Sequence, residues 1–238
     1  MSIRKSYSVA DIQHLSERTY RIILQCDQGY VPEYFAGQYL LIHLANNESS
    51  AFSIANPPVP DQQILELHIQ KVSDSQNSIE LFRQLELGAL EASVANGQCH
   101  LKSIPDKPLL FVAAGTGFAQ MKSMIEYCQN INHPHDIHLY WGARSPGDYY
   151  LPSLPVQWST AGIHYHPVVS ESSPNEEWNG RYGLLYDAII SDKAHLNSCE
   201  IYISGSPTMV YATVDAIASE GFNEKNMHSD VFEYAPRE

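Results

Sequence analysis

Short runs of alternating hydrophobic and polar residues dominate the first hundred positions of the chain. Runs with the character of β-strands lie at 19–26, 38–44, 51–55, 64–72 and 91–94, and turn-forming residues separate them. One segment, 78–87, has apolar residues near helical spacing instead. Several short strands joined by turns predict an antiparallel β-barrel for this part of the chain.

The pattern changes after Pro105. Predicted strands at 109–113, 137–141, 163–169 and 201–204 alternate with predicted helices at 118–130, 184–191 and 207–219. A long loop with three prolines follows position 141, and 227–234 is interpreted as a closing strand. Ser206 is a suitable cap for the last helix, with Pro207 as its first residue.

Alternation of strands and helices predicts an α/β domain with a parallel sheet. Pro105 and Pro108 interrupt both patterns. We therefore predict a two-domain protein, with an N-terminal antiparallel β-barrel over 1–104 and an α/β domain over 105–238.

Composition narrows the function. The formal net charge is −13 and the 14 Lys and Arg residues form no cluster, which argues against a nucleic-acid partner. No apolar run has the length of a membrane span, and residues 1–6 lack the apolar segment of a signal peptide. The four cysteines are far apart and have no iron–sulfur spacing, so we expect reduced thiols and a cytoplasmic location.

The most informative segment is 109–118, LLFVAAGTGF. An apolar strand stops at Gly115 and Gly117, with Thr116 between them, and a helix is predicted to begin at Phe118. Glycines allow an anion to approach the backbone, and the free N–H groups of a helix N-terminus face it, as the pyrophosphate of a dinucleotide requires. Gln120 stands where the full fingerprint has its third glycine, so a plain strand–turn–helix is the alternative.

A series of short motifs in a fixed order resembles the ferredoxin–NADP reductase superfamily, and in particular its small bacterial NAD(P)H–flavin reductases. These motifs are Gly37-Gln38-Tyr39, Ala51-Phe52-Ser53, Ser78 with Leu81 and Gly88, Gly97, Gly115-Thr116-Gly117-Phe118, Tyr140-Trp141-Gly142, Ser204-Gly205-Ser206-Pro207 with Met209, and Asp230-Val231-Phe232. The resemblance implies that the barrel binds flavin, that the α/β domain binds a nicotinamide nucleotide, and that both ligands meet in a cleft between the domains.

The resemblance also implies a flavin-facing strand that contains Ala51, Phe52, Ser53 and Ile54. Ser53 would lie beside flavin N5 and act as the catalytic residue, because a hydroxyl both donates and accepts. The family's arginine is missing from this motif, since Ser50 occupies its position. Flavin is then either an exchangeable substrate, which we favour, or is held by other contacts such as Arg83 or Lys71.

Two further barrel segments are similar to flavin-binding elements of the family. Asn77 and Ser78 lie in the turn that meets flavin phosphate in the family, although Ser75 replaces its glycine; the alternative is that Asn77 caps the helix. His68 and Ile69 lie on the strand that passes the flavin edge, where a satisfied histidine without a ligand is the alternative for His68.

In the α/β domain, the resemblance assigns Gly115, Thr116, Gly117 and Phe118 to the nucleotide. Arg144 follows the next strand, where NAD enzymes carry an acidic residue; Arg144 can accept a 2′-phosphate, so NADH and NADPH both stay open. Asp148 comes later in the same loop.

Two C-terminal segments complete the nucleotide side. Ser204, Gly205 and Pro207 resemble the Cys-Gly-Pro turn near the nicotinamide. Phe232 lies in a segment that is close to both rings in relatives, and core packing is its alternative role.

Other chemistries are not indicated. The pairs His133/His135 and His164/His166 have no cysteine or carboxylate that completes a ligand set, so we expect no metal. No GxSxG elbow is present, so acyl transfer is not expected.

The resemblance thus predicts hydride transfer from NADH or NADPH to N5 of a loosely bound flavin (FMN, FAD or riboflavin), with a flavin-dependent monooxygenase as a downstream user. The alternatives are an FAD-containing reductase that serves an oxygenase or a separate ferredoxin, and a regulatory subunit that binds without turnover.

Overall fold

The computed structural model describes residues 3–171 and 178–237, which form two compact units. The first unit comprises residues 1–102 and 122–131, and the second comprises 103–121 and 132–238. Met1 and Ser2 of the N-terminal segment considered above lie outside the described residues. The domain boundary at 104/105 stays a prediction.

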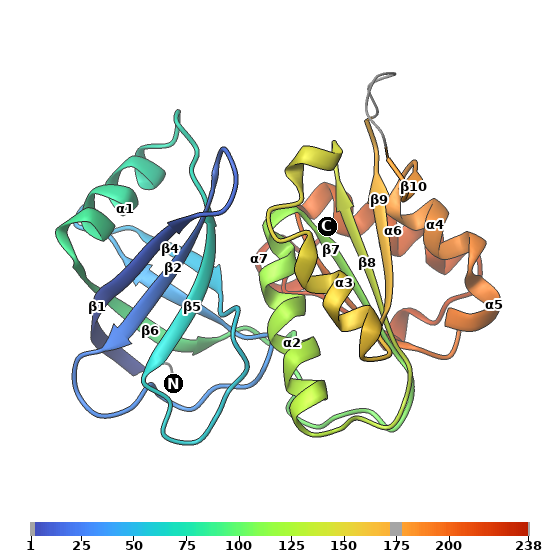
Figure 1. Ribbon diagram of the computed structural model, residues 1–238, viewed down its shortest axis with the longest axis horizontal. Coiled ribbons are helices and arrows are strands. Elements are labelled where there is room, and N and C mark those ends of the chain that lie inside the picture. Colours follow the sequence, from blue (N-terminus) through green and yellow to red (C-terminus); the bar gives the residue numbers. More distant parts are fainter. Residues whose placement is uncertain (1–2, 172–177, 238) are drawn as a thin grey trace. The chain divides into compact units, whose positions relative to one another are not determined.

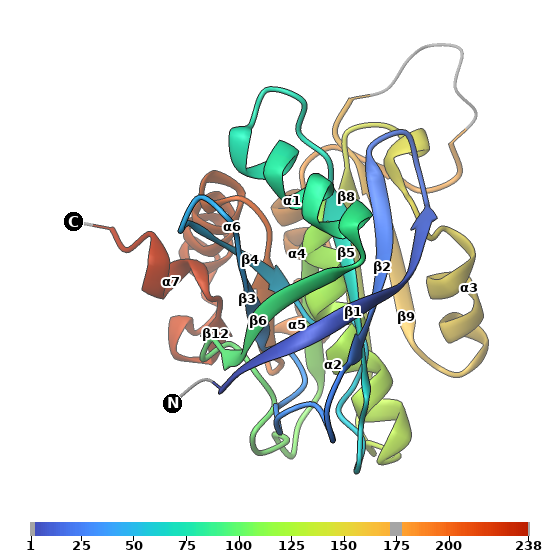
Figure 2. The same cartoon turned by 90° about the vertical axis from the view of Figure 1, so that its left-hand side faces the viewer.

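The first unit is built on a six-stranded antiparallel sheet in the order β4-β3-β6-β1-β2-β5 (Figures 1 and 2). A bridge between Ile54 and Leu67 links the two edge strands, so the sheet is nearly closed and the predicted antiparallel barrel is confirmed. The strands are β1 (Ile3–His14), β2 (Thr19–Cys26), β3 (Tyr39–His43), β4 (Ser49–Ser53), β5 (Ile64–Gln70) and β6 (Ala89–Asn96).

Strand β1 was not predicted from the sequence. Most of its side chains are exposed or half-buried and only Tyr7 is fully buried, so the strand lacks a clear alternating pattern. It pairs with β2 on one side and β6 on the other, and its register shifts between Val9 and Asp11. A bulge of this kind bends a strand and helps a sheet to curl.

Helix α1 (Gln76–Leu87) connects β5 to β6. The suggested cap Asn77 is wrong: Ser75 is the cap, and its side chain accepts a hydrogen bond from the Ser78 N–H. The helix ends at Gly88, which has the left-handed conformation of a helix C-terminus.

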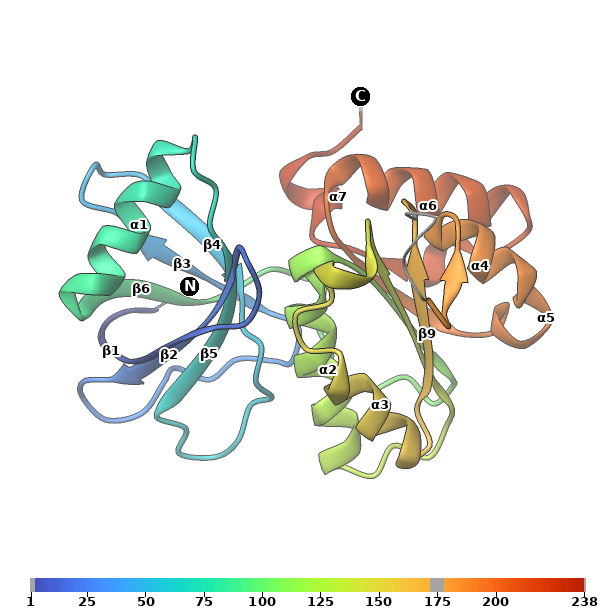
Figure 3. The same ribbon diagram turned by 45° about the horizontal axis from the view of Figure 1, so that its top comes forward.

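The second unit contains a six-stranded parallel sheet in the order β10-β9-β8-β7-β11-β12, which confirms the predicted α/β architecture. In Figure 3, α3 lies on one face of this sheet and α4 and α6 lie on the other. Its strands are β7 (Leu109–Ala114), β8 (Ile137–Ala143), β9 (His164–Val169), β10 (Arg181–Tyr182), β11 (Glu200–Ser204) and β12 (Met227–His228). Its helical segments are η1 (Gly115–Gly117), α2 (Phe118–Asn130), η2 (Pro146–Asp148), α3 (Ser153–Thr160), α4 (Leu185–Ser191), α5 (Lys193–Leu196), α6 (Pro207–Ser219), η3 (Glu224–Asn226) and α7 (Val231–Tyr234), with α2 from Lys122 onward grouped in the first unit.

Alternate residues of the central strands point to opposite faces of the sheet and pack in different clusters of buried side chains. Leu110, Val112 and Tyr140 pack in a buried cluster with residues of α4 and α6. On the other face, Phe118 at the start of α2 stacks on Trp141 at 3.8 Å between ring centroids and also contacts Trp158 of α3. Burial on both faces explains the continuous apolar character of these strands in the sequence.

Two sequence interpretations in this unit are wrong. The proline-containing loop after β8 includes the helix α3. The segment 227–234 is not one strand, because β12 covers only Met227 and His228 and the chain then turns into α7. The Asp230 carbonyl accepts the Glu233 N–H, which is a helical turn that apolar alternation alone does not reveal. The predicted cap of α6 is confirmed, since the Ser206 side chain accepts the Met209 N–H.

Replacing Gly37 with alanine is expected to destabilise the first unit by about 2–4 kcal/mol. Gly37 has φ +103°, and an added Cβ would overlap the Met124 methyl group and lie 2.7 Å from the Cys99 carbonyl oxygen. Gly29→Ala is the matched control: φ there is +68° but no atom lies within 4 Å, so about 1 kcal/mol is expected. Urea unfolding measures both, and equal losses would contradict the steric argument.

Candidate functional site

The proposed flavin strand ends beside β5. Ile54 bridges to Leu67, and the Ala55 N–H donates to the Glu66 carbonyl at 2.8 Å. Continuing this antiparallel register places Ser53 opposite His68. Phe52 and Ser53 are half-buried, whereas Ala51 is exposed and Ile54 is buried. Ser53 is therefore the polar side chain that this strand end offers to a ligand.

The β5 residues predicted to face flavin are both buried, but on opposite faces of the strand. The His68 imidazole is inaccessible, and its Nε2 lies 2.9 Å from Glu66 Oε1. Burial lowers the pKa of His68, so the ring is neutral and donates this hydrogen bond. Ile69 is in the barrel core. Any flavin contact of these two residues would be made by the backbone.

The start of α1 already uses its polar groups locally. Ser75 Oγ accepts the Ser78 N–H, and Ser78 Oγ accepts the Val72 N–H at 3.0 Å. Asn77 Oδ1 accepts a hydrogen bond from Asn46 Nδ2 at 3.1 Å. The phosphate turn suggested by the sequence is thus occupied by capping interactions.

The two cations considered as substitutes for the missing arginine are engaged as well. Arg83 forms two hydrogen bonds to the Glu80 carboxylate, at 2.9 and 2.7 Å. Lys71 Nζ lies 4.9 Å from the centroid of the Phe82 ring.

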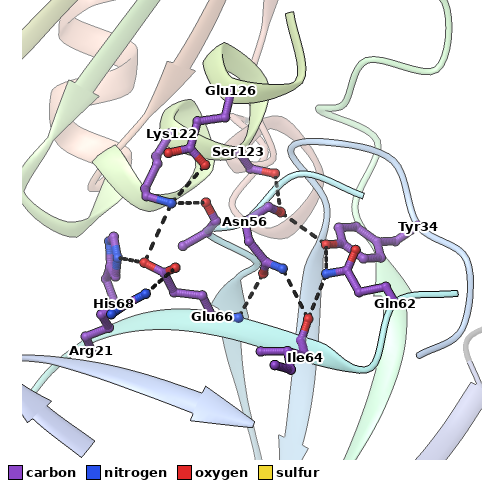
Figure 4. A network of polar contacts seen from close by, with 11 residues as sticks. Arg21, Tyr34, Asn56, Gln62, Ile64, Glu66, His68, Lys122, Ser123 and Glu126 are labelled. Carbon is purple, nitrogen blue, oxygen red and sulfur yellow. Dashed lines mark hydrogen bonds and ion pairs between the residues drawn. The ribbon is translucent and has the colours of Figure 1, made fainter. Parts of the chain in front are cut away.

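A buried polar network on the outer face of β5 is centred on Glu66 (Figure 4). Its carboxylate receives His68 and, at 3.2 Å, Arg21, and Lys122 Nζ lies 3.6 Å away. Lys122 also binds Glu126 Oε2 at 2.9 Å and the Ala55 carbonyl at 3.2 Å. Burial alone would raise the pKa of Glu66, but the His68 hydrogen bond, the Lys122 charge and the Arg21 hydrogen bond lower it to about 2.

The network also holds the chain that follows Ser53. Besides the Lys122–Ala55 contact, Ser123 Oγ donates to the Asn56 carbonyl at 2.9 Å. The Asn56 side chain in turn accepts the Glu66 N–H at 2.8 Å and donates to the Ile64 carbonyl at 3.1 Å. The segment two and three residues beyond Ser53 is therefore fixed from both sides. Sequence reasoning missed this, because Glu66 and Lys122 are distant along the chain.

The glycine turn of the second unit has the form predicted for it. Gly115 has φ +53° and begins the short helix η1, and α2 follows directly. Trp141 Nε1 donates to the Gly115 carbonyl at 3.2 Å, and its ring stacks on Phe118. Gly115 is exposed and Thr116 and Gly117 are half-buried, so the turn is open to a ligand. Phe118 is buried and supports the turn from below.

The turns after β7 and β11 lie side by side. A Cβ on Gly117 would overlap the Ser204 carbonyl oxygen, and one on Gly205 would lie 3.1 Å from Ala114 Cβ. β7 and β11 are parallel neighbours, so both turns are at the carboxyl edge of the sheet. The structure thus brings Gly115–Gly117 together with Ser204 and Gly205, while Pro207 begins α6.

Arg144 follows β8 at the same edge and is exposed. Asp148, the nearest acidic residue in this loop, accepts the Ser145 N–H at 2.9 Å and the Ser145 hydroxyl at 3.0 Å. Its carboxylate stabilises the loop η2.

Phe232 lies in α7, where its ring is 5.9 Å from the Tyr211 ring and packs against the core of the unit. The start of this segment is tied to α2, because Gln120 Nε2 donates to Asp230 Oδ2 at 2.8 Å. Gln120 is buried at the position where the fingerprint has its third glycine. That departure was visible in the sequence, but its partner was not.

Acidification is expected to destabilise the first unit through this network. The folded pKa of Glu66 is depressed to about 2, so its contribution is present above the unfolded value near 4.5 and is lost as pH falls from about 5 toward 2. The lowered pKa of His68 acts in the same direction below its unfolded value of about 6.5. Urea unfolding at several pH values should show a free energy of unfolding that falls with pH.

Glu66→Gln should flatten this pH dependence and lower stability at pH 7, because Lys122 and Arg21 lose their buried partner. Glu80→Gln, which removes an exposed ion pair, should leave the slope nearly unchanged. Equal slopes in all three proteins would rule out the network as the cause.

Comparison with known proteins identifies the nucleotide unit. The family described as the oxidoreductase NAD-binding domain matches residues 111–215, which include the glycine turn, Arg144 and the turn after β11. In the described part of the chain, helices are too short or too polar to cross a membrane.

Two relatives match nearly the whole chain. An NAD(P)H-flavin reductase of Vibrio harveyi is 32% identical over 204 residues, which are 83% of this chain and 84% of that protein. The reductase component 1 of a terephthalate 1,2-dioxygenase of a Comamonas species is 34% identical over 215 residues, 90% of this chain and 63% of that one. The chain spans about three fifths of the length of two curated relatives that are 34% identical to it.

The fold also has solved counterparts. A ferredoxin NADP⁺ reductase of Neisseria gonorrhoeae, with bound FAD and NADP, superimposes with a TM-score of 0.77 and 19% identity, over 95% of this chain and 98% of the other. This structure shows the shared fold, and the relative from Vibrio harveyi shows that the chain belongs to the family of the NAD(P)H-flavin reductases.

Proposed function

We propose that the chain is an NAD(P)H:flavin oxidoreductase whose flavin is an exchangeable substrate. A hydride passes from C4 of the reduced nicotinamide to N5 of FMN, FAD or riboflavin. With one proton from solvent, the products are oxidised nucleotide and reduced flavin, so electrons and atoms balance.

The observation that carries this proposal is the weak phosphate anchor on the barrel. Ser50 stands in place of an arginine, Ser78 N–H is used by Ser75, and Arg83 is paired with Glu80. A hydrogen bond to a charged group contributes about 1.5–3 kcal/mol, so losing one weakens binding about ten- to a hundredfold. A flavin held mainly by its ring would exchange readily.

Ser53 is the proposed catalytic residue. Its hydroxyl can donate to N5 before reduction and accept from it afterwards. The fixed segment after it, held by Lys122 and Ser123, keeps the end of this strand in one place. Positioning of this kind is the protein's main contribution when the two reactants carry the chemistry themselves.

Gly115, Thr116 and Gly117 are the proposed pyrophosphate residues. Because η1 runs directly into α2, the first N–H groups of this helical segment are those of Gly115, Thr116 and Gly117, and Gly117 allows the close approach of the Ser204 turn. Arg144 and Asp148 are both exposed, but the Asp148 carboxylate accepts from Ser145, and a 2′-phosphate would suit the Arg144 guanidinium. We therefore propose that NADPH is accepted as well as NADH.

An FAD-containing reductase component is the second candidate, since a relative of this kind is 34% identical over 90% of the chain. It would pass electrons to an oxygenase or a ferredoxin. The four cysteines are buried free thiols in separate places, so in the described residues they supply no iron–sulfur ligand set. A protein that keeps its yellow colour through gel filtration would favour this candidate.

We propose a cytoplasmic location, which the free thiols favour, and a flavin-dependent monooxygenase as a user of the reduced flavin. The user of the product is identified by its chemistry: it is an enzyme that binds free reduced flavin and oxidises it.

Purified protein is expected to oxidise NADH or NADPH only when free flavin is added. Nucleotide oxidation followed by absorbance, with FMN, FAD and riboflavin compared, tests this directly. Turnover without added flavin, from tightly held FAD, would favour the reductase component instead. No turnover with any flavin would point to a regulatory subunit.

Ser53→Ala should lower kcat about tenfold or more with a smaller change in the KM for flavin, because loss of one hydrogen bond of about 1.5 kcal/mol to the reacting atom corresponds to that factor. Ser49→Ala, at the other end of the same strand, is the control and should retain full activity. An unchanged kcat in Ser53→Ala would remove this residue from the mechanism.

A further inference from the structure

Strand pairing in the second unit brings His164 beside Asp136 and His138, which are two positions apart in the sequence. His138 of β8 pairs directly with His164 of β9, and their rings stack with centroids 4.6 Å apart and planes at 17°. Asp136 immediately precedes β8, and its Oδ1 lies 3.8 Å from His164 Nε2. One ligand atom from each residue lies within 4.8 Å of the other two.

The surroundings leave this group available to a cation. Asp136 and His164 are exposed, with side-chain accessibilities of 71% and 51%, so an ion can reach them from solvent. His138 is half-buried, and its Nδ1 is buried without a hydrogen-bond partner.

Other side chains of β8 and β9 pack beside this group. Tyr140 donates its hydroxyl to Asp192, which also binds Arg181. His166 stacks on Tyr140 at 4.3 Å and on His138 at 6.0 Å, and its Nε2 is buried without a hydrogen-bond partner.

Zinc bonds to imidazole nitrogen at about 2.0–2.1 Å, so two ligand atoms of one ion are at most about 4.2 Å apart. The ligand atoms here lie within 4.8 Å of one another and the two rings are stacked, so binding requires the exposed Asp136 and His164 side chains to rotate until their lone pairs converge with that of His138. Two imidazoles and one carboxylate are a ligand set for Zn²⁺ and similar transition metals, whereas Mg²⁺ and Ca²⁺ prefer oxygen ligands alone.

We propose that Asp136, His138 and His164 form a binding site for Zn²⁺ or a similar divalent transition metal, which links β8 to β9. The site lies at the amino ends of these strands, whereas the glycine turn and Arg144 lie at the carboxyl ends. It is therefore separate from the proposed nucleotide site and does not depend on the proposed reaction.

Isothermal titration with Zn²⁺ alone, on the full chain cleared of metal by a chelator, tests this proposal. We expect one site per chain, and a Zn²⁺-dependent rise in the midpoint of thermal unfolding, since a ligand that binds the folded state stabilises it. Mg²⁺ should produce neither effect.

Single variants locate the site. His164→Ala and Asp136→Asn change exposed residues, so both should fold normally and weaken Zn²⁺ binding at least about tenfold. His138→Ala should do the same, but its half-buried position makes the two exposed variants the decisive ones. His135→Ala is the matched control, because His135 precedes Asp136 but pairs with Asp106 and is not in the ligand group, so its loss should leave the affinity unchanged.

Unchanged Zn²⁺ affinity in both His164→Ala and Asp136→Asn would overturn the proposal. Loss of binding in His135→Ala alone would also overturn it and assign the metal to the His135–Asp106 pair. Binding only at millimolar Zn²⁺, with no thermal shift, would show adventitious contact with surface histidines.

Discussion

A buried carboxylate is the constraint around which the barrel unit is arranged. Glu66 lies on a strand whose other face fills the core, so it must be paired or it would cost several kcal/mol. His68, Arg21 and Lys122 supply the partners from two strands and one helix. The same lysine holds the backbone that follows Ser53, so satisfying a buried charge also fixes the end of the proposed flavin strand.

In the α/β unit, the main constraint is the close contact between two turns. Gly117 exists as glycine because the Ser204 carbonyl occupies the place of a side chain, and Gly205 faces Ala114 in the same way. Two turns from neighbouring parallel strands can then share one edge of the sheet. An aromatic stack of Phe118 on Trp141, with the Trp141 N–H on the Gly115 carbonyl, fixes the first of these turns. Both turns lie within the residues that match the oxidoreductase NAD-binding domain, which supports the proposal that this edge binds the nucleotide.

Two departures from the family pattern bear on the proposed hold on flavin. Serine stands in place of arginine, and the Ser78 N–H at the start of α1 is taken by the cap Ser75, so the proposed phosphate contact loses two groups. A third departure, Gln120, adds an internal contact, since its side chain donates to Asp230. The proposal of an exchangeable flavin follows from the first two.

The sequence by itself determined most regular elements and the order of the two folds. Strand β2 and helices α2 and α6 begin and end where the pattern predicts, because burial of one or both faces requires hydrophobic residues at regular intervals in the sequence. The glycine turn and the Ser206 cap were equally local. Strand β1 was missed because hardly any of its side chains are buried, and α7 was mistaken for a strand because four residues are too few to show a period.

Only the tertiary structure decided which polar residues meet. Glu66 and Lys122, Gln120 and Asp230, and the group of Asp136, His138 and His164 each join residues that are separated along the chain by a strand or more. Neither residue type nor spacing encodes such pairs. They arise from strand register and helix packing, which are set by the hydrophobic positions and not by the charges themselves.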